Sequence, residues 1–172
     1  IIETAKKVIR DTFKVDVNEI PTINRRSESV AKEKINYSIS NDETNIVLGT
    51  GGSGETKRVP SKIFLEVMKN TLKKRKCKFF IATGNAKEEI EILDQILKSD
   101  LKEFCIPLNN LNISKIIPII KNCDVSICND SSFSHLSAAL NIPTIVLMAD
   151  TPLVYGSYNT LMQPHGRSGH AG

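Results

Sequence analysis

The sequence predicts an α/β fold: a doubly wound, Rossmann-like parallel sheet of about five to six strands with helices on both faces. From residue 45 onward, short apolar runs alternate with longer segments in which apolar residues recur at helical spacing. The apolar runs lack the alternation of half-exposed strands, which indicates strands that are buried on both faces. Alternating strands and helices of this kind form parallel sheets with right-handed crossovers.

Residues 1–44 are predicted to form a connector or docking segment without chemistry of its own. An amphipathic helix is expected over residues 1–14, where Ile2, Ala5, Ile9 and Phe13 recur between charged residues. A polar stretch that contains Pro21 follows, and a second short helix is expected over residues 27–37.

Residues 45–155 are predicted to be the sheet domain. The expected strands are 45–49, 78–82, 104–106, 125–128 and 144–148. Helices are expected over 61–74, around 90–97, over 114–122 and from about 131, and Pro118 suggests a late start or a kink in the third of them. Ligands of such sheets bind at the carboxyl ends of the strands, where the loops after the first, second and fourth strands should converge.

Residues 156–172 are expected to form a polar, glycine-rich tail. His165 and His170 could in principle bind a metal ion, but no periodic segment holds them, so we predict a flexible tail and no metal site.

The composition predicts one ordinary globular domain with an aliphatic core. The 172 residues are 40% apolar and 24% charged, tryptophan is absent, and aromatic residues make up 5%. The formal net charge of +4 is compatible with an anionic substrate, or with peripheral contact at the inner face of the cytoplasmic membrane. Basic and aromatic residues are not interleaved, so nucleic acid is not an expected partner.

The cysteines predict neither disulfides nor a metal centre. They lie in or beside apolar runs and form no Cys-x-x-Cys pair. Buried, reduced thiols in a cytoplasmic protein are the simplest interpretation. No apolar run approaches the roughly 20 residues of a membrane-spanning helix, and no signal peptide is visible. Because the chain begins with Ile rather than Met, we expect a piece of a longer protein.

The segment 128–135 is the first candidate site. It follows a buried strand and begins a helix whose first turn is rich in hydroxyls, with Asp130 or Ser131 as the N-cap. Such a helix start exposes N–H groups and a partial positive charge, which favour a phosphate. The core face is predicted to hold Phe133, Leu136 and Leu140, and the other side His135 with Ser131 and Ala138. A capped helix with a surface or hydrogen-bonded histidine is an equally good interpretation of this segment alone.

The glycine-rich loop at residues 49–54 is the second candidate site. It matches G-x-G-x-x-G, but Pro60 delays the next helix and no acidic residue ends the second strand, which weakens a dinucleotide fingerprint. Glu55 stands where a P-loop has its lysine. The loop can still expose backbone N–H groups to an anion, with Lys57 as a point charge and Arg58 as a bidentate fork. An ordinary flexible loop with solvated basic residues is the alternative.

Together these two motifs resemble the ADP-heptose:lipopolysaccharide heptosyltransferase family over residues 45–155. Its Pro-Gly-Ala-Ser-like loop, with a lysine three residues before a proline, corresponds to 50–53 and 57–60. Its Asp-Thr-Gly-Leu-Ser-His-Leu-x-Ala-Ala signature corresponds to 130–139, and its Gly-Val-Pro-Thr and Gly-Pro-Thr-x-Pro segments to 141–144 and 149–152. The chain departs from the family where Ser132 replaces a glycine, Phe133 a leucine and Thr50 a proline.

The resemblance implies the C-terminal, donor-binding half of a glycosyltransferase of the GT-B type. Loop residues would contact the donor phosphates, the helix start would hold the diphosphate and the sugar, and His135 would lie close to the diphosphate. Glu88 or Glu89 would meet the ribose, and residues 108–111 would line an adenine slot. The candidate substrate-binding residues are Gly51, Gly52, Ser53, Lys57, Arg58, Glu88, Glu89, Leu111, Asp130, Ser131, Ser132, Phe133 and His135.

The implied reaction is metal-independent, inverting transfer of heptose from ADP-heptose to a lipopolysaccharide core or similar glycan, without a further cofactor. The family's acid/base carboxylate belongs to an N-terminal Rossmann-like half that this chain lacks, so no catalytic residue is named here. Two alternatives stay open. One is an NADP-dependent oxidoreductase that uses the basic run at 73–76 for a 2′-phosphate, and the other is a non-catalytic nucleotide-binding module.

Overall fold

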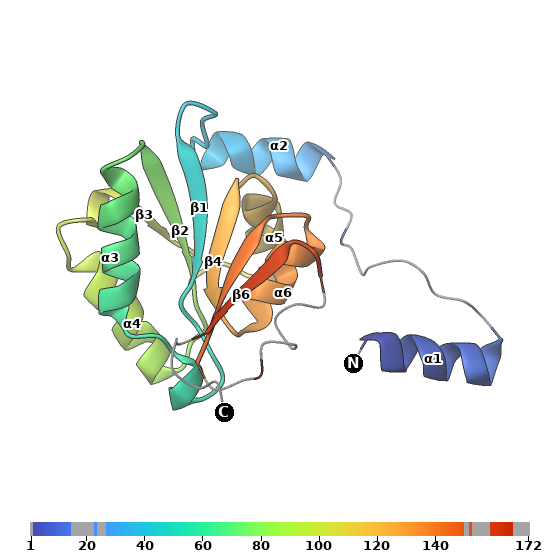
Figure 1. Ribbon diagram of the computed structural model, residues 1–172. Helices are drawn as coiled ribbons and strands as arrows, with labels where there is room; N and C mark the ends of the chain where they lie inside the picture. Colours follow the sequence, from blue (N-terminus) through green and yellow to red (C-terminus); the bar gives the residue numbers. More distant parts are fainter. Residues whose placement is uncertain (1, 15–22, 24–26, 150–151, 153–158, 167–172) are drawn as a thin grey trace.

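Six parallel strands form one sheet with helices on both faces, as the computed structural model in Figure 1 shows. The structure describes residues 2–14, 23, 27–149, 152 and 159–166. The strand order is β3-β2-β1-β4-β5-β6, and every neighbouring pair is parallel. The predicted doubly wound α/β class is therefore confirmed, with the order of a Rossmann fold.

The strands and helices alternate along the chain after the first two helices. The strands are β1 Thr44–Gly49, β2 Cys77–Ala82, β3 Cys105–Pro107, β4 Val125–Asn129, β5 Thr144–Met148 and β6 Met162–Gly166. The α-helices are α1 Ile2–Phe13, α2 Ser27–Asn36, α3 Ser61–Leu72, α4 Lys87–Leu97, α5 Ile113–Lys121 and α6 Ser132–Ala139. Two short 3₁₀ helices, η1 Glu55–Lys57 and η2 Lys102–Phe104, lie in the connections.

Alternate residues of the central strands feed two separate core layers. Ile46 and Leu48 of β1 pack in one layer with apolar residues of α3 and α4. Val47 of β1 packs in the other layer, where α5 and α6 cover the sheet. Because both faces of the central strands β1, β2 and β4 are covered, these strands are continuous apolar runs, which is why the sequence predicted them.

The sixth strand corrects the expected polar tail. Met162–Gly166 lies along β5 in parallel register, with Thr144 opposite Met162 and Met148 opposite Gly166. His165 therefore belongs to an edge strand, whereas His170 lies outside the described residues. The sequence of β6, Met-Gln-Pro-His-Gly, lacks the apolar pattern of a buried strand. Its strand conformation therefore depends on pairing with β5 rather than on local sequence.

The connector helices differ in their relation to the sheet. Helix α2 packs against α5, and the Asn122 side chain donates a hydrogen bond to Val30 O at 2.7 Å. Helix α1 lies apart from the sheet in Figure 1. Helix α5 begins at Ile113 and includes Pro118, so that of the two expectations, a late start or a kink, the late start is wrong. No helix in the described part of the chain is long and apolar enough to cross a membrane.

The predicted burial of the cysteines holds for three of the four, and all four are free thiols in the structure. Cys77, Cys123 and Cys128 are buried, and Cys105 is half-buried. Burial raises the pKa of Cys128 to about 11, against smaller lowering effects of hydrogen bonds from Ser126 and Gly49. This thiol packs against the end of β1 and has a structural rather than a chemical role.

Phe80 in the centre of β2 should be among the residues on which stability depends. Its side chain is fully buried between β1 and α5, so Phe80→Ala should lower the free energy of unfolding by about 3–5 kcal/mol through lost burial and a cavity. Chemical denaturation measures this loss. Ile35→Ala is the control, because Ile35 is 78% exposed and should change stability by less than about 0.5 kcal/mol. Equal losses in the two variants would contradict the described core.

Candidate functional site

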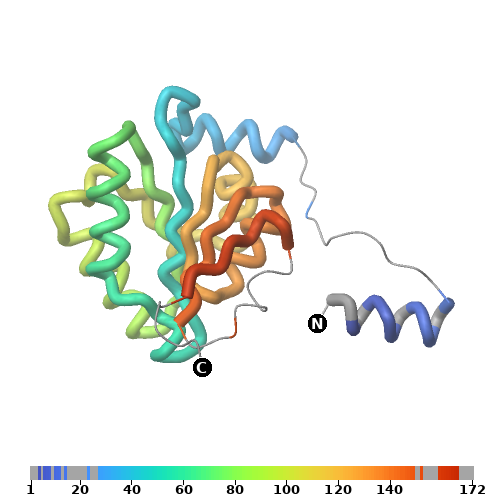
Figure 2. Tube along the Cα trace, in the orientation of Figure 1, coloured from blue at the N-terminus to red at the C-terminus, as the bar shows by residue number. Residues whose placement is uncertain are grey.

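The loops that follow β1, β2 and β4 enclose a pocket of about 520 Å³ at the carboxyl edge of the sheet. Figure 2 shows these loops at one end of the molecule. The winding changes sides between β1 and β4, where an open α/β sheet leaves a crevice for ligands. The lining residues come from all three loops: Gly51, Gly52, Ser53, Gly54, Arg58, Gly84, Ala86, Glu89, Ser131, Ser132 and Phe133.

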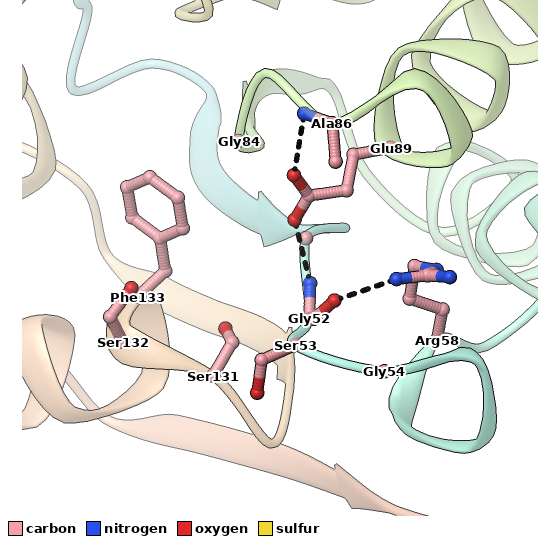
Figure 3. A pocket seen from close by; sticks show the side chains of 11 residues that line it. Gly52, Ser53, Gly54, Arg58, Gly84, Ala86, Glu89, Ser131, Ser132 and Phe133 are labelled. Carbon is pink, nitrogen blue, oxygen red and sulfur yellow. Dashed lines mark hydrogen bonds between the residues drawn. The ribbon is translucent and has the colours of Figure 1, made fainter.

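Two charged side chains hold Gly52 at the floor of the glycine-rich loop (Figure 3). Gly52 N donates to Glu89 Oε1 at 2.9 Å, and Arg58 Nη1 donates to Gly52 O at 2.9 Å. Glu89 Oε2 also accepts from Ala86 N at 3.1 Å, at the start of α4. The Glu89 carboxylate thus accepts the hydrogen bond of a loop N–H that was expected to face a phosphate.

Gly51 lies close to the loop after β2. A Cβ at this position would come within 2.7 Å of Glu89 Oε1 and 3.1 Å of Gly84 N. A side chain here would therefore displace the Glu89 carboxylate and push against the loop after β2. This contact forms the wall of the pocket opposite α6.

The start of α6 forms the other side of the pocket. Ser131 takes the N-cap position with an extended backbone, but its hydroxyl makes no capping hydrogen bond. Its Oγ is buried and has no hydrogen-bond partner among the described residues. Ser134 closes the first turn instead, because its N and Oγ both donate to Ser131 O, at 3.1 and 2.7 Å. A buried, unused hydroxyl at a helix start suits an anionic ligand.

A charged group of three residues lies beside the pocket rather than in its lining. Lys57 Nζ is 3.0 Å from Asp130 Oδ2, and their side chains are 31% and 10% exposed. Burial lowers the pKa of the half-buried His135 below 6.5; the negative charge of Asp130 opposes this shift and the positive charge of Lys57 adds to it. The lysine expected at the phosphates therefore pairs with the expected diphosphate-binding aspartate.

The predicted faces of α6 are correct on one side of the helix. Phe133 and Leu136 pack against the core layer that contains Leu140, as expected. The opposite side was expected to be open, but Ala138 is fully buried against β5 and β6, next to Val146. Pairing of β6 with β5 extends the sheet past α6 and covers Ala138, whereas Ser131 and His135 on the same side of the helix remain half-buried.

Two expected contact regions do not line the pocket. Glu88 is exposed and borders a separate hollow with Glu55 and Glu91. Leu108 is fully buried in the core, and Leu111 packs against the same layer. The remaining candidates, Gly51, Gly52, Ser53, Arg58, Glu89 and Ser131–Phe133, lie together at the pocket. Asp150 and Thr151 lie outside the described residues.

Asn129 is a site residue that sequence reasoning missed. It ends β4 and is fully buried, with its carboxamide between the two ends of the glycine-rich loop. The available signal was a polar residue at the end of an apolar strand, directly before the acidic and hydroxyl residues of 130–132.

The geometry argues against the dinucleotide interpretation. The glycine motif leads into the three-residue η1, and α3 begins only after Pro60, so no helix opens within the motif. The basic residues Lys74–Lys76 border a hollow with Thr44 at the amino end of β1, on the opposite edge of the sheet. They are therefore remote from any ribose bound at the pocket. Within the described ranges, no cluster of three or more His, Cys, Asp or Glu residues could hold a metal ion.

Comparison with known sequences gives one family. The family model of glycosyltransferase family 9 (heptosyltransferase) matches residues 2–161. Lipooligosaccharide heptosyltransferase 2 of Haemophilus influenzae is 37% identical over 75 residues, which cover 42% of this chain and 22% of that protein. Lipopolysaccharide heptosyltransferase 1 of Campylobacter coli is 27% identical over 155 residues, covering 86% of this chain and 42% of that protein.

Comparison with solved structures gives the same fold. The Escherichia coli ADP-heptose lipopolysaccharide heptosyltransferase II superposes with a TM-score of 0.71 at 19% identity, covering 90% of this chain and 47% of that one. The E. coli heptosyltransferase WaaC with ADP-2-deoxy-2-fluoro heptose gives 0.68 at 14% identity, covering 95% and 48%. This chain thus spans less than half the length of the relatives that it matches. None of these similarities supports an oxidoreductase.

The lowered pKa of His135 predicts a dependence of stability on pH. The unfolded chain binds the proton at about pH 6.5, whereas the folded chain binds it only at lower pH. Between these two values the unfolded state holds more protons, so the contribution of neutral His135 is present near pH 7 and is lost as pH falls through this window. We expect His135→Gln to gain stability relative to wild type as the pH falls from about 7 to about 5.

Denaturant unfolding of both proteins across this pH range measures the difference. The exposed His165→Gln variant controls for the loss of one histidine. A wild-type-minus-His135→Gln difference that stays constant with pH would contradict the described environment of His135.

Proposed function

Because the chain belongs to glycosyltransferase family 9, the heptosyltransferase family, we propose that it is the donor-binding half of a glycosyltransferase that uses a nucleoside-diphosphate sugar. One observation carries this proposal: a glycine-rich loop and a hydroxyl-rich helix start face each other across one pocket at the switch point of the sheet. Each feature is of a kind that can bind an anion, and two such features lining one pocket suit a diphosphate.

The loop side would bind one phosphate through backbone and guanidinium groups. Gly51–Gly54 line the pocket without side-chain bulk except at Ser53, whose hydroxyl is exposed and can donate. Arg58 uses Nη1 to hold Gly52 O, and its guanidinium carries further N–H donors for an oxyanion. The loop is therefore anchored and charged at the same time.

The helix side would bind the second phosphate. Ser131 presents its buried hydroxyl at the N-terminus of α6, where the helix dipole favours negative charge. Lys57 lies beside the pocket, where its ammonium is paired with Asp130 at 3.0 Å. A diphosphate in the pocket would compete with Asp130 for the lysine ammonium, and His135 would lie close to the same charge.

The nucleoside would lie beyond Gly52, toward the loop after β2. Glu89 has both carboxylate oxygens in backbone hydrogen bonds, and each oxygen can accept a further bond from a ribose hydroxyl. ADP-heptose is the donor we propose, since one similar E. coli structure is an ADP-heptose lipopolysaccharide heptosyltransferase and another was solved with ADP-2-deoxy-2-fluoro heptose. The acceptor would be a lipopolysaccharide core or a related glycan, as the names of the relatives suggest.

In the proposed reaction, this half stabilises the leaving group. A carboxylate in the N-terminal Rossmann-like half would deprotonate the acceptor hydroxyl, and the hydroxyl would attack the anomeric carbon of the donor with inversion. Backbone N–H groups, Arg58 and Lys57 would stabilise the departing diphosphate. Such an enzyme would work in the cytoplasm, at the inner face of the membrane where its lipid-linked acceptor would lie.

Lys57→Ala tests the proposed diphosphate contact. Removing the ammonium should weaken ADP or ADP-sugar binding by about 1–3 kcal/mol, the value of a hydrogen bond to a charged group. In calorimetry this corresponds to a loss of roughly 5- to 150-fold in affinity. Lys62→Ala is the matched control, because Lys62 is exposed on α3 and should leave affinity unchanged.

Two results would contradict the proposal. The first is a wild-type chain that binds neither ADP nor an ADP-sugar. The second is equal affinity in the Lys57→Ala and Lys62→Ala variants, which would place the bound phosphates away from Lys57.

A further inference from the structure

The two ends of the glycine-rich loop meet at one buried side chain. Asn129 Nδ2 donates to Thr50 O at 2.9 Å and to Gly51 O at 3.4 Å, where the loop leaves β1. Asn129 Oδ1 accepts from Val59 N at 3.3 Å, where the loop approaches α3. The single carboxamide of Asn129 therefore bridges the two ends of the loop formed by residues 51–58.

Only an amide satisfies all three backbone groups. Two carbonyl oxygens need donors and one N–H needs an acceptor, and asparagine offers both on a planar group of fixed size. An ionised aspartate has no donor, so its carboxylate oxygen would face the carbonyl oxygens of Thr50 and Gly51 without a hydrogen bond and would repel them. An apolar residue would leave three buried backbone groups unpaired, at a cost in stability.

Asn129 also links the loop to the opposite side of the pocket. Its own backbone continues into Asp130 and Ser131, at the start of α6. Glu89 and Arg58 hold Gly52 from the side of α4 and from within the loop, whereas Asn129 holds the loop from the side of β4. The spacing between the loop N–H groups and the α6 N-terminus thus depends on this residue.

We propose that Asn129 is a positioning residue that sets the separation of the two phosphate-binding sides, and so selects diphosphates over monophosphates. The inference rests on the proposed function. A diphosphate can meet the loop and the helix start together, whereas a monophosphate meets only one of them. A change in the spacing therefore penalises the diphosphate and leaves the monophosphate nearly unaffected.

Asn129→Asp tests this with little change in side-chain volume. We expect the preference for ADP over AMP, measured by calorimetry on the wild-type chain and the variant, to fall about tenfold or more. Amides of residues 51–59 should exchange hydrogen faster in the unliganded variant, while amides of β2 keep their protection. Asn70→Asp is the control, because Asn70 is exposed on α3 and the substitution adds the same charge.

Lowering the pH should restore the nucleotide preference of Asn129→Asp, which would not happen if the substitution only destabilised the fold. A buried carboxyl between two carbonyl oxygens has a raised pKa, and once protonated it can donate to Thr50 O. As the pH is lowered from about 8 to about 5.5, the ADP-over-AMP preference of Asn129→Asp should therefore return toward that of wild type measured at the same pH. If this variant does not fold at the higher pH, the ADP-over-AMP preference is measured on Asn129→Ser instead. The serine hydroxyl can replace only part of the three hydrogen bonds that Asn129 makes to the loop.

The outcomes separate this inference from the proposed function. A wild-type chain that binds neither nucleotide contradicts the proposed function and this inference with it. A wild-type chain that prefers ADP, with folded Asn129 variants that keep the full preference and the wild-type exchange of the loop, overturns the role of Asn129 alone. Equal losses for ADP and AMP would also overturn it.

Discussion

The pairing of β1 with β4 is the interaction on which the site depends. Gly49 lies opposite Cys128 in this parallel pair, and a Cβ at Gly49 would come within 2.8 Å of Cys128 Cβ. The two strands end at the same edge, yet their connections leave toward opposite faces, since α3 and α6 cover different core layers. The divergence of these connections leaves the pocket open, and the glycine permits the strand ends to lie close.

Around this opening, charged and polar groups satisfy one another in the unliganded protein. Lys57 pairs with Asp130, and Glu89 holds Gly52 N while Arg58 holds Gly52 O. The Ser131 hydroxyl is buried beside the pocket without a partner among the described residues. A dianionic ligand would therefore enter a site that is already ordered, and it would replace internal contacts instead of organising a mobile loop.

The sequence predicted the fold where local pattern and tertiary environment agree, as in the apolar runs of β1, β2 and β4. It failed at β6, because Met162–Gly166 has no strand pattern and acquires its structure from pairing with β5. It identified Gly51, Gly52, Ser53 and Ser131 as pocket residues through the chemistry of loops and helix starts. It could not predict that Lys57 pairs with Asp130, or that Asn129 spans the loop, because these contacts join residues about 70 positions apart. Local spacing also could not show that Glu88 and Leu111 lie outside the lining of the pocket.

The central claim is that both sides of one pocket bind one diphosphate. Titration of the isotopically labelled chain with ADP, followed through backbone amide resonances, tests it most directly. If both sides bind the same diphosphate, the resonances of Gly51–Gly54 and of Ser131–Phe133 should shift together with a single dissociation constant. Shifts confined to one side, or centred on Lys74–Lys76 at the opposite edge of the sheet, would contradict it.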